Sequence, residues 1–211
     1  GQGDAFLIEF ACGAALIDAG YQNRNENKQR LADYLAWFFQ EHRPDLENTL
    51  SLAVVSHSHA DHASGFPIVL GDPPARVALT VNNAVDNGYD VTGGAEEQIR
   101  LRESSLDGYH AIKVRDIAWY EGATSSLIDP VGAWRLGSAE PLIRVLWGGW
   151  DYDPDADKNP NHHSVVVRID FGQASFLFTG DLQVGGSAKP GGLDSLLSEY
   201  GGGASSFRGG G

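Results

Sequence analysis

The chain contains the stretch Val54-Val55-Ser56-His57-Ser58-His59-Ala60-Asp61-His62, in which three imidazoles and one carboxylate directly follow a β-branched apolar run. Imidazole nitrogen and carboxylate oxygen are ligands that first-row divalent metals such as zinc take up. In an extended segment residues two apart point the same way, so His57 and His59 can bind one ion, and a turn after them could aim Asp61 and His62 at a second. The stretch predicts a metal site; a solvated loop or a buried histidine cluster is the alternative.

Length and composition indicate one folded domain. The 211 residues suffice for one sizeable core or at most two small ones, and the hydrophobic content of 42%, with five Trp and nine Phe, favours a folded globule. No apolar run reaches the roughly 18 residues that a membrane span needs.

The net charge of −13 argues against a broad surface for phosphate groups, so nucleic acid is a possible partner that the charge does not favour. Four basic residues in the middle of the chain could form a local exception or belong to a solvated face with mixed charges: Arg100, Arg102, Lys113 and Arg115.

The sulfur-containing residues are few. Cys12 is the single cysteine, which excludes an internal disulfide framework and a cysteine-based zinc site, and we expect it to be a small buried hydrophobe. There is no methionine, not even at position 1, so we expect the sequence to be part of a longer translation product.

Apolar periodicity and turn residues predict an α/β chain. We expect a hairpin of strands 5–10 and 14–18 joined around Gly13, an amphipathic helix over 28–42 that ends before Pro44, and a buried strand over 52–55. Further strands are predicted over 77–81, 111–114, 142–147, 164–169 and 174–178, further helices over 95–102 and 193–200, and a flexible glycine-rich tail over 201–211. The strand over 174–178 leads into Thr179-Gly180-Asp181, where a glycine suits close backbone approach and a carboxylate can serve as a ligand.

In three blocks the chain resembles the metallo-β-lactamase-fold hydrolases, and within them the soluble domain of the bacterial DNA-uptake competence protein ComEC and its free-standing relatives. The blocks are Gly1-Gln-Gly-Asp-Ala5 with Leu16-Ile-Asp-Ala-Gly20, the motif from His57 to Gly65, and Asn161-His-His-Ser-Val-Val-Val-Arg-Ile with Phe178-Thr-Gly-Asp181. The resemblance implies a four-layer αββα sandwich over residues 1–200, cut short at its C-terminal end.

The resemblance also implies a ligand set for two divalent ions, zinc first, with manganese or iron as alternatives. By position, His57 and His59 would bind the first metal, Asp61 and His62 the second, and Asp181 both. His162 is the candidate for the additional ligand of the first metal, with His163 as the alternative. Asn161 could instead hydrogen-bond to substrate or to a ligand, and Asp18 either orients a ligand or caps the turn before Gly20.

One departure from the superfamily pattern concerns the second metal. The superfamily supplies a last histidine after the Thr-Gly-Asp block, whereas no histidine follows His163 in this chain. Either the sequence stops before that segment or the second site is incomplete, with Asp61, His62 and Asp181 as its ligands.

Two further groups of residues have open roles. The alternating Asp151, Asp153, Asp155 and Asp157 lack the Gly and Glu of a calcium loop, so we expect a solvated acidic loop, with outer support of the metal centre as the alternative. Five aromatic residues either line a pocket or fill core space: Trp119, Tyr120, Trp134, Trp147 and Trp150.

These observations lead to an expected function with Asp61 in the catalytic centre. Two metal ions would lower the pKa of a water and present hydroxide to phosphorus or to a carbonyl carbon. The resemblance favours phosphodiesters, in nucleotides or DNA, in a soluble bacterial domain whose compartment and oligomeric state stay open. Hydrolysis of lactones, thioesters or β-lactams is the alternative, and a degenerate metal-binding module without catalysis is another.

Overall fold

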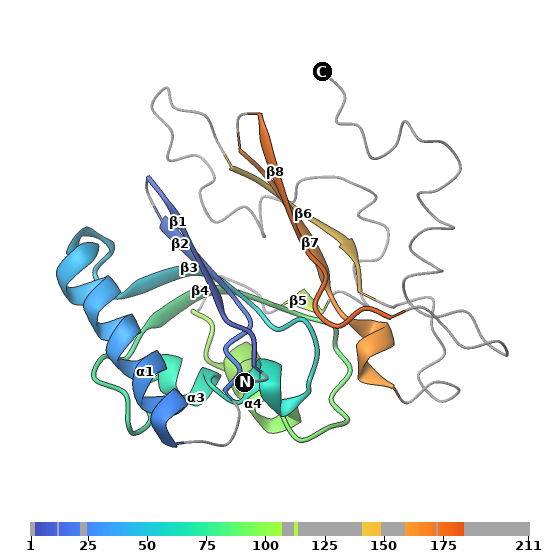
Figure 1. Ribbon diagram of the computed structural model, residues 1–211, viewed down its shortest axis with the longest axis horizontal. Helices are drawn as coiled ribbons and strands as arrows, with labels where there is room; N and C mark the ends of the chain where they lie inside the picture. Colours follow the sequence, from blue (N-terminus) through green and yellow to red (C-terminus); the bar gives the residue numbers. More distant parts are fainter. Residues whose placement is uncertain are drawn as a thin grey trace, which may run out of the picture.

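The computed structural model of the chain describes residues 3–11, 13–21, 25–106, 112–113, 141–148, 159–171 and 173–183. In it two β-sheets face each other, and helices cover the outer face of the first sheet (Figure 1). The predictions for Cys12, for Arg115, for most of the aromatic cluster, for the acidic run and for the chain after residue 183 lie outside the described residues.

The first sheet has five strands in the order β1-β2-β3-β4-β5, and the second has three in the order β6-β7-β8. β1 is antiparallel to β2, the other pairs of the first sheet are parallel, and the second sheet is antiparallel. The strands of the first sheet are β1 (Phe6–Phe10), β2 (Gly13–Ile17), β3 (Thr49–Val54), β4 (Thr80–Asp86) and β5 (Ile112–Lys113). Those of the second sheet are β6 (Pro141–Trp147), β7 (Val166–Phe171) and β8 (Ala174–Phe178).

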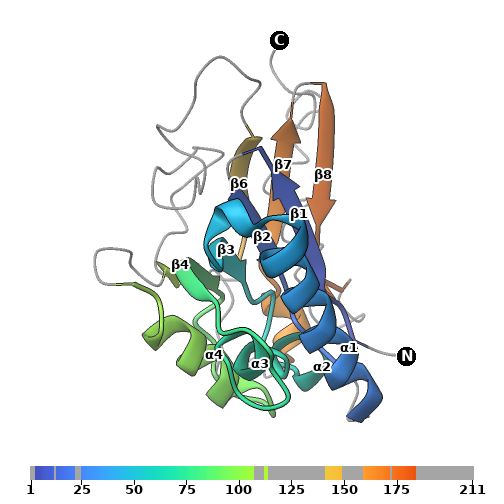
Figure 2. The same cartoon turned by 90° about the vertical axis from the view of Figure 1, so that its left-hand side faces the viewer.

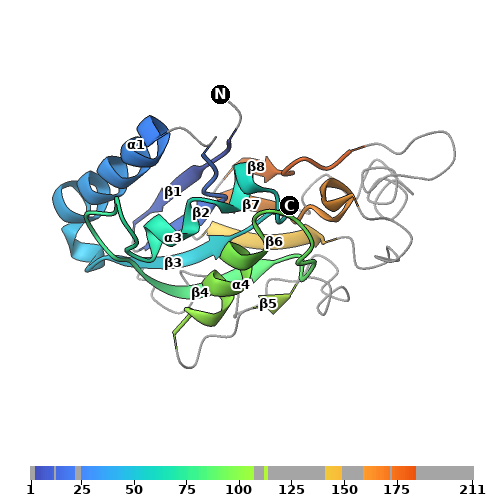
Figure 3. The same ribbon diagram turned by 90° about the horizontal axis from the view of Figure 1, so that it is seen from below.

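The helices are short except for α1 and α4, and α1, α3 and α4 lie across one face of the first sheet (Figure 3). The α-helices are α1 (Asn25–Ala36), α2 (Ala60–Ala63), α3 (Phe66–Val69) and α4 (Ala95–Glu103). α1 continues as the π-helical turn η1 (Trp37–His42), and two 3-10 turns follow along the chain, η2 (Pro44–Leu46) and η5 (Pro160–His163). No helix in the described part of the chain combines the length and the hydrophobicity needed to cross a bilayer.

Two apolar cores hold the layers together, one on each face of the first sheet. The strands β2 and β3 are therefore buried on both faces, as is usual for parallel strands between two layers. Leu16 and Ala14 face the helices and pack with Leu35, Phe39 and Phe66. Their neighbours along the strand face the second sheet, and this inter-sheet core consists of Phe10, Ala15, Ile17, Leu52, Val54, Val85, Ile143, Val145, Val165, Val167 and Ile169. The chain thus has the mixed α/β, layered fold that the sequence predicts.

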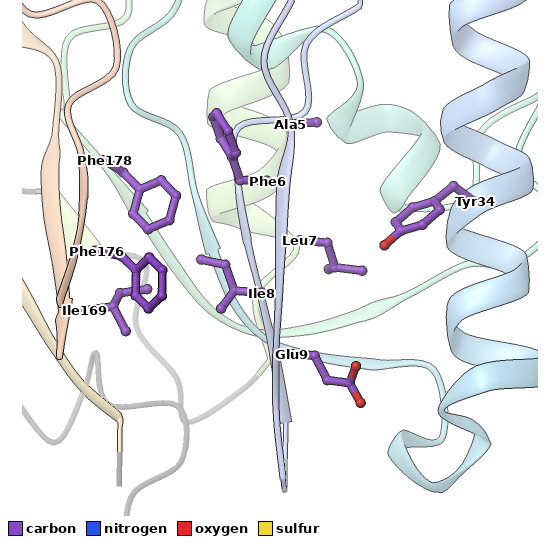
Figure 4. A pocket seen from close by; sticks show the side chains of 9 residues that line it. All are labelled: Ala5, Phe6, Leu7, Ile8, Glu9, Tyr34, Ile169, Phe176 and Phe178. Carbon is purple, nitrogen blue, oxygen red and sulfur yellow. The ribbon is translucent and has the colours of Figure 1, made fainter. Parts of the chain in front are cut away.

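At its open edge, beside β1, the inter-sheet space forms an apolar groove of about 550 Å³. Phe6 and Ile8 turn toward Phe176 and Phe178 of the second sheet (Figure 4), and the rings of Phe6 and Phe178 lie 5.5 Å apart. On the other side of β1, Leu7 and Glu9 turn toward α1 (Figure 4). The groove therefore follows an edge strand of the first sheet.

The structure corrects two predicted details. The strand expected over 77–81 is β4, which begins at Thr80 and ends at Asp86. Its polar residues make the sequence look like a loop, but Asn83, for example, is buried and donates a hydrogen bond to Ser51 O. Gly13 is not in the turn but opens β2, opposite Phe10. A Cβ on Gly13 would lie 2.6 Å from Ser51 Oγ, so this glycine permits close approach of β3.

Candidate metal centre

Three segments that are far apart in the sequence meet beyond the carboxyl end of β3. The histidine loop, residues 56–62, leaves β3 and enters α2; the turn η5 precedes β7, and residues 179–181 follow β8. Figure 2 shows α2 at this end of the first sheet. A parallel strand commonly delivers functional residues at its carboxyl end, where loops from neighbouring strands converge.

Backbone hydrogen bonds fix the histidine loop from several sides. Val165 N donates to Ser56 O at 2.7 Å, Gly94 N to Ser58 O at 2.8 Å, and Ala19 N to His62 O at 2.8 Å. The first of these bonds comes from the segment that leads into the second sheet. The loop is therefore held against both sheets.

The donor atoms converge in this loop. His57 Nε2 and His59 Nδ1 lie 3.0 Å apart, and His62 Nε2 lies 3.4 Å from Asp181 Oδ1. His57, His62 and Asp181 each offer one ligand atom, and these three atoms all lie within 4.8 Å of one another. Two ligands of a tetrahedral zinc ion, each bonded at 2.0–2.1 Å, are about 3.3 Å apart, so both close pairs have the spacing of a shared cation.

Asp18 orients one of these imidazoles. It is buried at the end of β2 with a φ of 56°, a backbone conformation that is uncommon for a residue other than glycine. Its Oδ1 accepts from Ser56 N at 2.7 Å, and its Oδ2 accepts from Ser56 Oγ at 2.7 Å and from His62 Nδ1 at 2.8 Å. Because Nδ1 of His62 donates to Asp18, Nε2 is the atom left for a metal, which would complete a carboxylate–histidine–metal triad.

Ser56 orients the other buried imidazole and was not among the residues predicted from the sequence. Since its hydroxyl donates to Asp18, its oxygen accepts from His57 Nδ1 at 3.0 Å, which leaves His57 Nε2 facing His59. Ser164 Oγ lies 3.4 Å from the same Nδ1. A serine directly before the first histidine is the only signal of this role in the sequence.

The two buried histidines have opposite pKa shifts. Burial lowers the pKa of His57 to about 2, and the nearby charges of His62 and His59 act in the same direction, so the His57 imidazole is neutral, as a metal ligand must be. Burial alone would lower the pKa of His62 as well, but the hydrogen bond to Asp18 and the charges of Asp18, Asp181 and Asp61 outweigh it and raise the pKa to about 9. His62 would lose this proton on binding a cation.

Gly180 brings Asp181 to the histidine loop. It has a φ of 51°, and a Cβ at this position would lie 2.7 Å from Ser56 Cβ and 3.2 Å from Ser164 Cβ. Only glycine allows the two loops to approach so closely without strain. The predicted importance of the Thr-Gly-Asp block therefore has a physical basis in packing.

The other predicted site residues surround this group. Asp61 lies half-buried in the first turn of α2, and its charge contributes to the raised pKa of His62. His162 is half-buried, with Nε2 3.4 Å from Asn159 Nδ2, and the buried His163 packs its ring against Tyr89 at 4.6 Å. Within the described residues the three-atom group does not include His59, Asp61 or His162. The assignment of these residues to a first and a second metal therefore stays a prediction.

A further observation fits a bound ion or substrate. Asn161 Oδ1 is buried and has no hydrogen-bond partner in the structure. An unpartnered buried acceptor costs free energy unless a ligand, an ion or a water satisfies it. The donor set of imidazoles and carboxylates around it is one that divalent cations bind.

A comparison with models of protein families identifies the family of the chain. Residues 1–208 match the family model of the metallo-beta-lactamase superfamily, and a search of curated proteins gave no match. A solved structure described as a new diphosphatase from the PhnP family is 15% identical to this chain, with a TM-score of 0.34. The similarity covers 82% of this chain and 51% of the diphosphatase, so the chain spans about half the length of that protein. Because the family model matches nearly the whole chain, the protein belongs to the metallo-β-lactamase superfamily.

Proposed function

We propose that this chain is a hydrolase that binds two divalent cations, zinc in the first instance, and cleaves phosphodiesters in nucleotides or DNA. Membership of the superfamily supports metal-dependent hydrolysis. The observation that carries the proposal is the convergence of His57, His62 and Asp181, whose ligand atoms lie within 4.8 Å of one another. The phosphodiester is the finer part of the proposal and rests on the resemblance of the sequence blocks to the competence-protein branch.

The proposed ligands are those that the resemblance implies. His57, His59 and His162 would bind one cation and Asp61 and His62 the other, with Asp181 between them. When bound, the cations lower the pKa of a water and stabilise negative charge that develops on the substrate.

The protein's own contribution is orientation. Asp18 and Ser56 keep the Nδ1 atoms of His62 and His57 occupied, so that both Nε2 atoms are available. Asn161 Oδ1, the buried acceptor without a partner, is a candidate to receive a hydrogen bond from substrate or from a water.

Asp61 is the residue whose replacement tests the proposal. Asp61→Asn keeps the shape of the side chain but removes a negative charge beside His62, so we expect hydrolysis of a simple phosphodiester to fall about 1,000-fold, a loss of about 4 kcal/mol of transition-state stabilisation. The circular dichroism spectrum and Tm of the metal-free variant should stay near those of the wild type because Asp61 is only half-buried. Full activity in this variant would contradict the two-metal proposal.

A second candidate function is a metal-binding module without catalysis. The observation that favours it is that, within the described residues, the converging ligand atoms come from three residues, His57, His62 and Asp181, which could hold a single cation. The wild-type chain distinguishes the two candidates, because a module would bind metal and show no hydrolysis of a simple phosphodiester.

A further inference from the structure

Asn87 lies directly after β4 and is 1% exposed. Its side chain makes three hydrogen bonds, one within its own loop, one to α4 and one to η5. Nδ2 donates to His163 O at 3.0 Å, and Oδ1 accepts from Tyr89 N at 3.0 Å and from Gln98 Nε2 at 3.3 Å. A buried amide that uses both its donor and its acceptor in this way fixes the segments relative to one another.

The hydrogen bonds continue from Asn87 to the histidine loop. Ser58 Oγ donates to Tyr89 O at 3.0 Å, and the Tyr89 ring packs against the ring of His163. Ser58 lies between His57 and His59, and His163 follows His162. The path from Ser58 through Tyr89 and Asn87 to His163 therefore joins the two segments that carry the proposed ligands of the first metal.

The loop that contains Asn87 is itself anchored to α4. Asp86 Oδ1 accepts from Gly88 N at 2.7 Å, and Asp86 Oδ2 accepts from Arg102 Nε at 2.6 Å. Asp90 accepts from Arg102 and from Gln98 on the same helix. A loop fixed at both ends can determine where a neighbouring turn lies.

Asn83 on β4 shows what such an amide does away from the site. It is 4% exposed, and its Nδ2 also donates to a backbone carbonyl at 3.0 Å, that of Ser51. This bond joins β4 to β3 within the sheet, where neither strand carries a proposed ligand. Asn83 and Asn87 therefore match in burial and in the length of the Nδ2 bond, and they differ in the segment that this bond fixes. They also differ at Oδ1, which has no partner in Asn83 and accepts two hydrogen bonds in Asn87.

We propose that Asn87 is a positioning residue, which sets the turn η5, and with it His162, at the distance from His57 and His59 that a shared metal ion requires. The residue type fits this role because a carboxylate would lack the donor for His163 O, and glutamine would be one methylene too long. The inference rests on the proposed function, in which His162 is a ligand.

The test is a titration of the metal-free protein with Co²⁺, in which the visible absorption of the bound ion measures binding. It is done with the wild type, Asn87→Ala, Asn83→Ala, His162→Ala and the double variant of Asn87 and His162. We expect Asn87→Ala to weaken binding of the first ion about 10- to 100-fold, the range seen when outer partners of ligands are removed. Asn83→Ala should change binding less than about 3-fold. Both replacements lower the Tm, because Asn83→Ala removes one buried hydrogen bond and Asn87→Ala removes three. The double variant should bind no more weakly than His162→Ala, since Asn87 acts through His162.

Equal affinities of Asn87→Ala and Asn83→Ala would overturn the inference, as would additive losses in the double variant. If Asn87→Ala does not fold, Asn87→Ser keeps an uncharged side-chain oxygen that can accept from Tyr89 N and lacks the amide donor to His163 O, and the same weakening is expected. If the wild-type protein binds no Co²⁺, the proposed function itself is overturned. If the wild type binds Co²⁺ and the Asn87 variant binds it equally tightly, only the role of Asn87 is overturned.

Discussion

Asp181→Asn is expected to reduce hydrolysis about 1,000-fold or more and to lower the bound metal by at least one equivalent, because a cation supplies several kcal/mol of transition-state stabilisation and each 1.4 kcal/mol is worth tenfold. Asp181 is the one carboxylate in the group of converging donor atoms, 3.4 Å from His62 Nε2. An amide keeps the shape but lacks the charge that offsets two cations. Steady-state rates and metal analysis of the purified variant measure both effects.

Asp72→Asn is the matched control for this variant. Asp72 has a side chain 44% exposed, against 40% for Asp181, and it also forms an ion pair, with Arg100 on α4. The control should keep its metal and its activity, since exposed ion pairs contribute little to stability. Wild-type metal content and rate in Asp181→Asn would show that this aspartate is not a ligand.

Gly20→Ala is expected to destabilise the protein by more than about 3 kcal/mol, among the largest effects of a single methyl group. A Cβ on Gly20 would lie 1.4 Å from Asp61 O and 2.0 Å from Asp61 C, both of them backbone atoms that no rotamer change can move. Gly20 N also donates to Asp4 O at 2.8 Å, and Asp4 N donates to Asp61 O at 3.1 Å. The methyl group would therefore push the histidine loop away from β2, and urea denaturation should show the loss.

Gly93→Ala serves as the comparison, because a Cβ at Gly93 meets no atom within 4 Å. Its free energy of unfolding should stay within about 0.5 kcal/mol of the wild type or rise slightly, since alanine reduces the entropy of the unfolded chain. A Gly20 variant as stable as the Gly93 variant would show that the close contact between β2 and the histidine loop is not present in solution.

The sequence predicts the layers of the fold well because the elements that form them have clear periodicity. The apolar residues 52–55 lie largely in β3, which is buried on both faces, and the predicted helix over 95–102 becomes α4. The predicted helix over 28–42 occupies that range but changes to a π-helical turn at Trp37, a backbone change that side-chain periodicity does not reveal. β4 was placed too early because its buried polar residues resemble a loop in sequence.

The candidate site was predictable where its residues form one contiguous motif, and less so where they meet only in space. His57 to His62 can be found by spacing alone. Ser56, Ser164 and Asn87 cannot, because a single hydroxyl or amide has no pattern until its partners are known. The close approaches at Gly20 and Gly180 depend on the packing of loops, which sequence spacing does not contain.

The central claim is that this donor set binds two divalent cations, and metal analysis of the purified wild-type chain tests it most directly. The protein is made metal-free, incubated with excess zinc, freed of unbound ions by gel filtration and analysed by inductively coupled plasma mass spectrometry. About two equivalents of zinc per chain are predicted, as for a two-metal hydrolase. Fewer than about one and a half equivalents, with no hydrolysis of a simple phosphodiester, would contradict the claim.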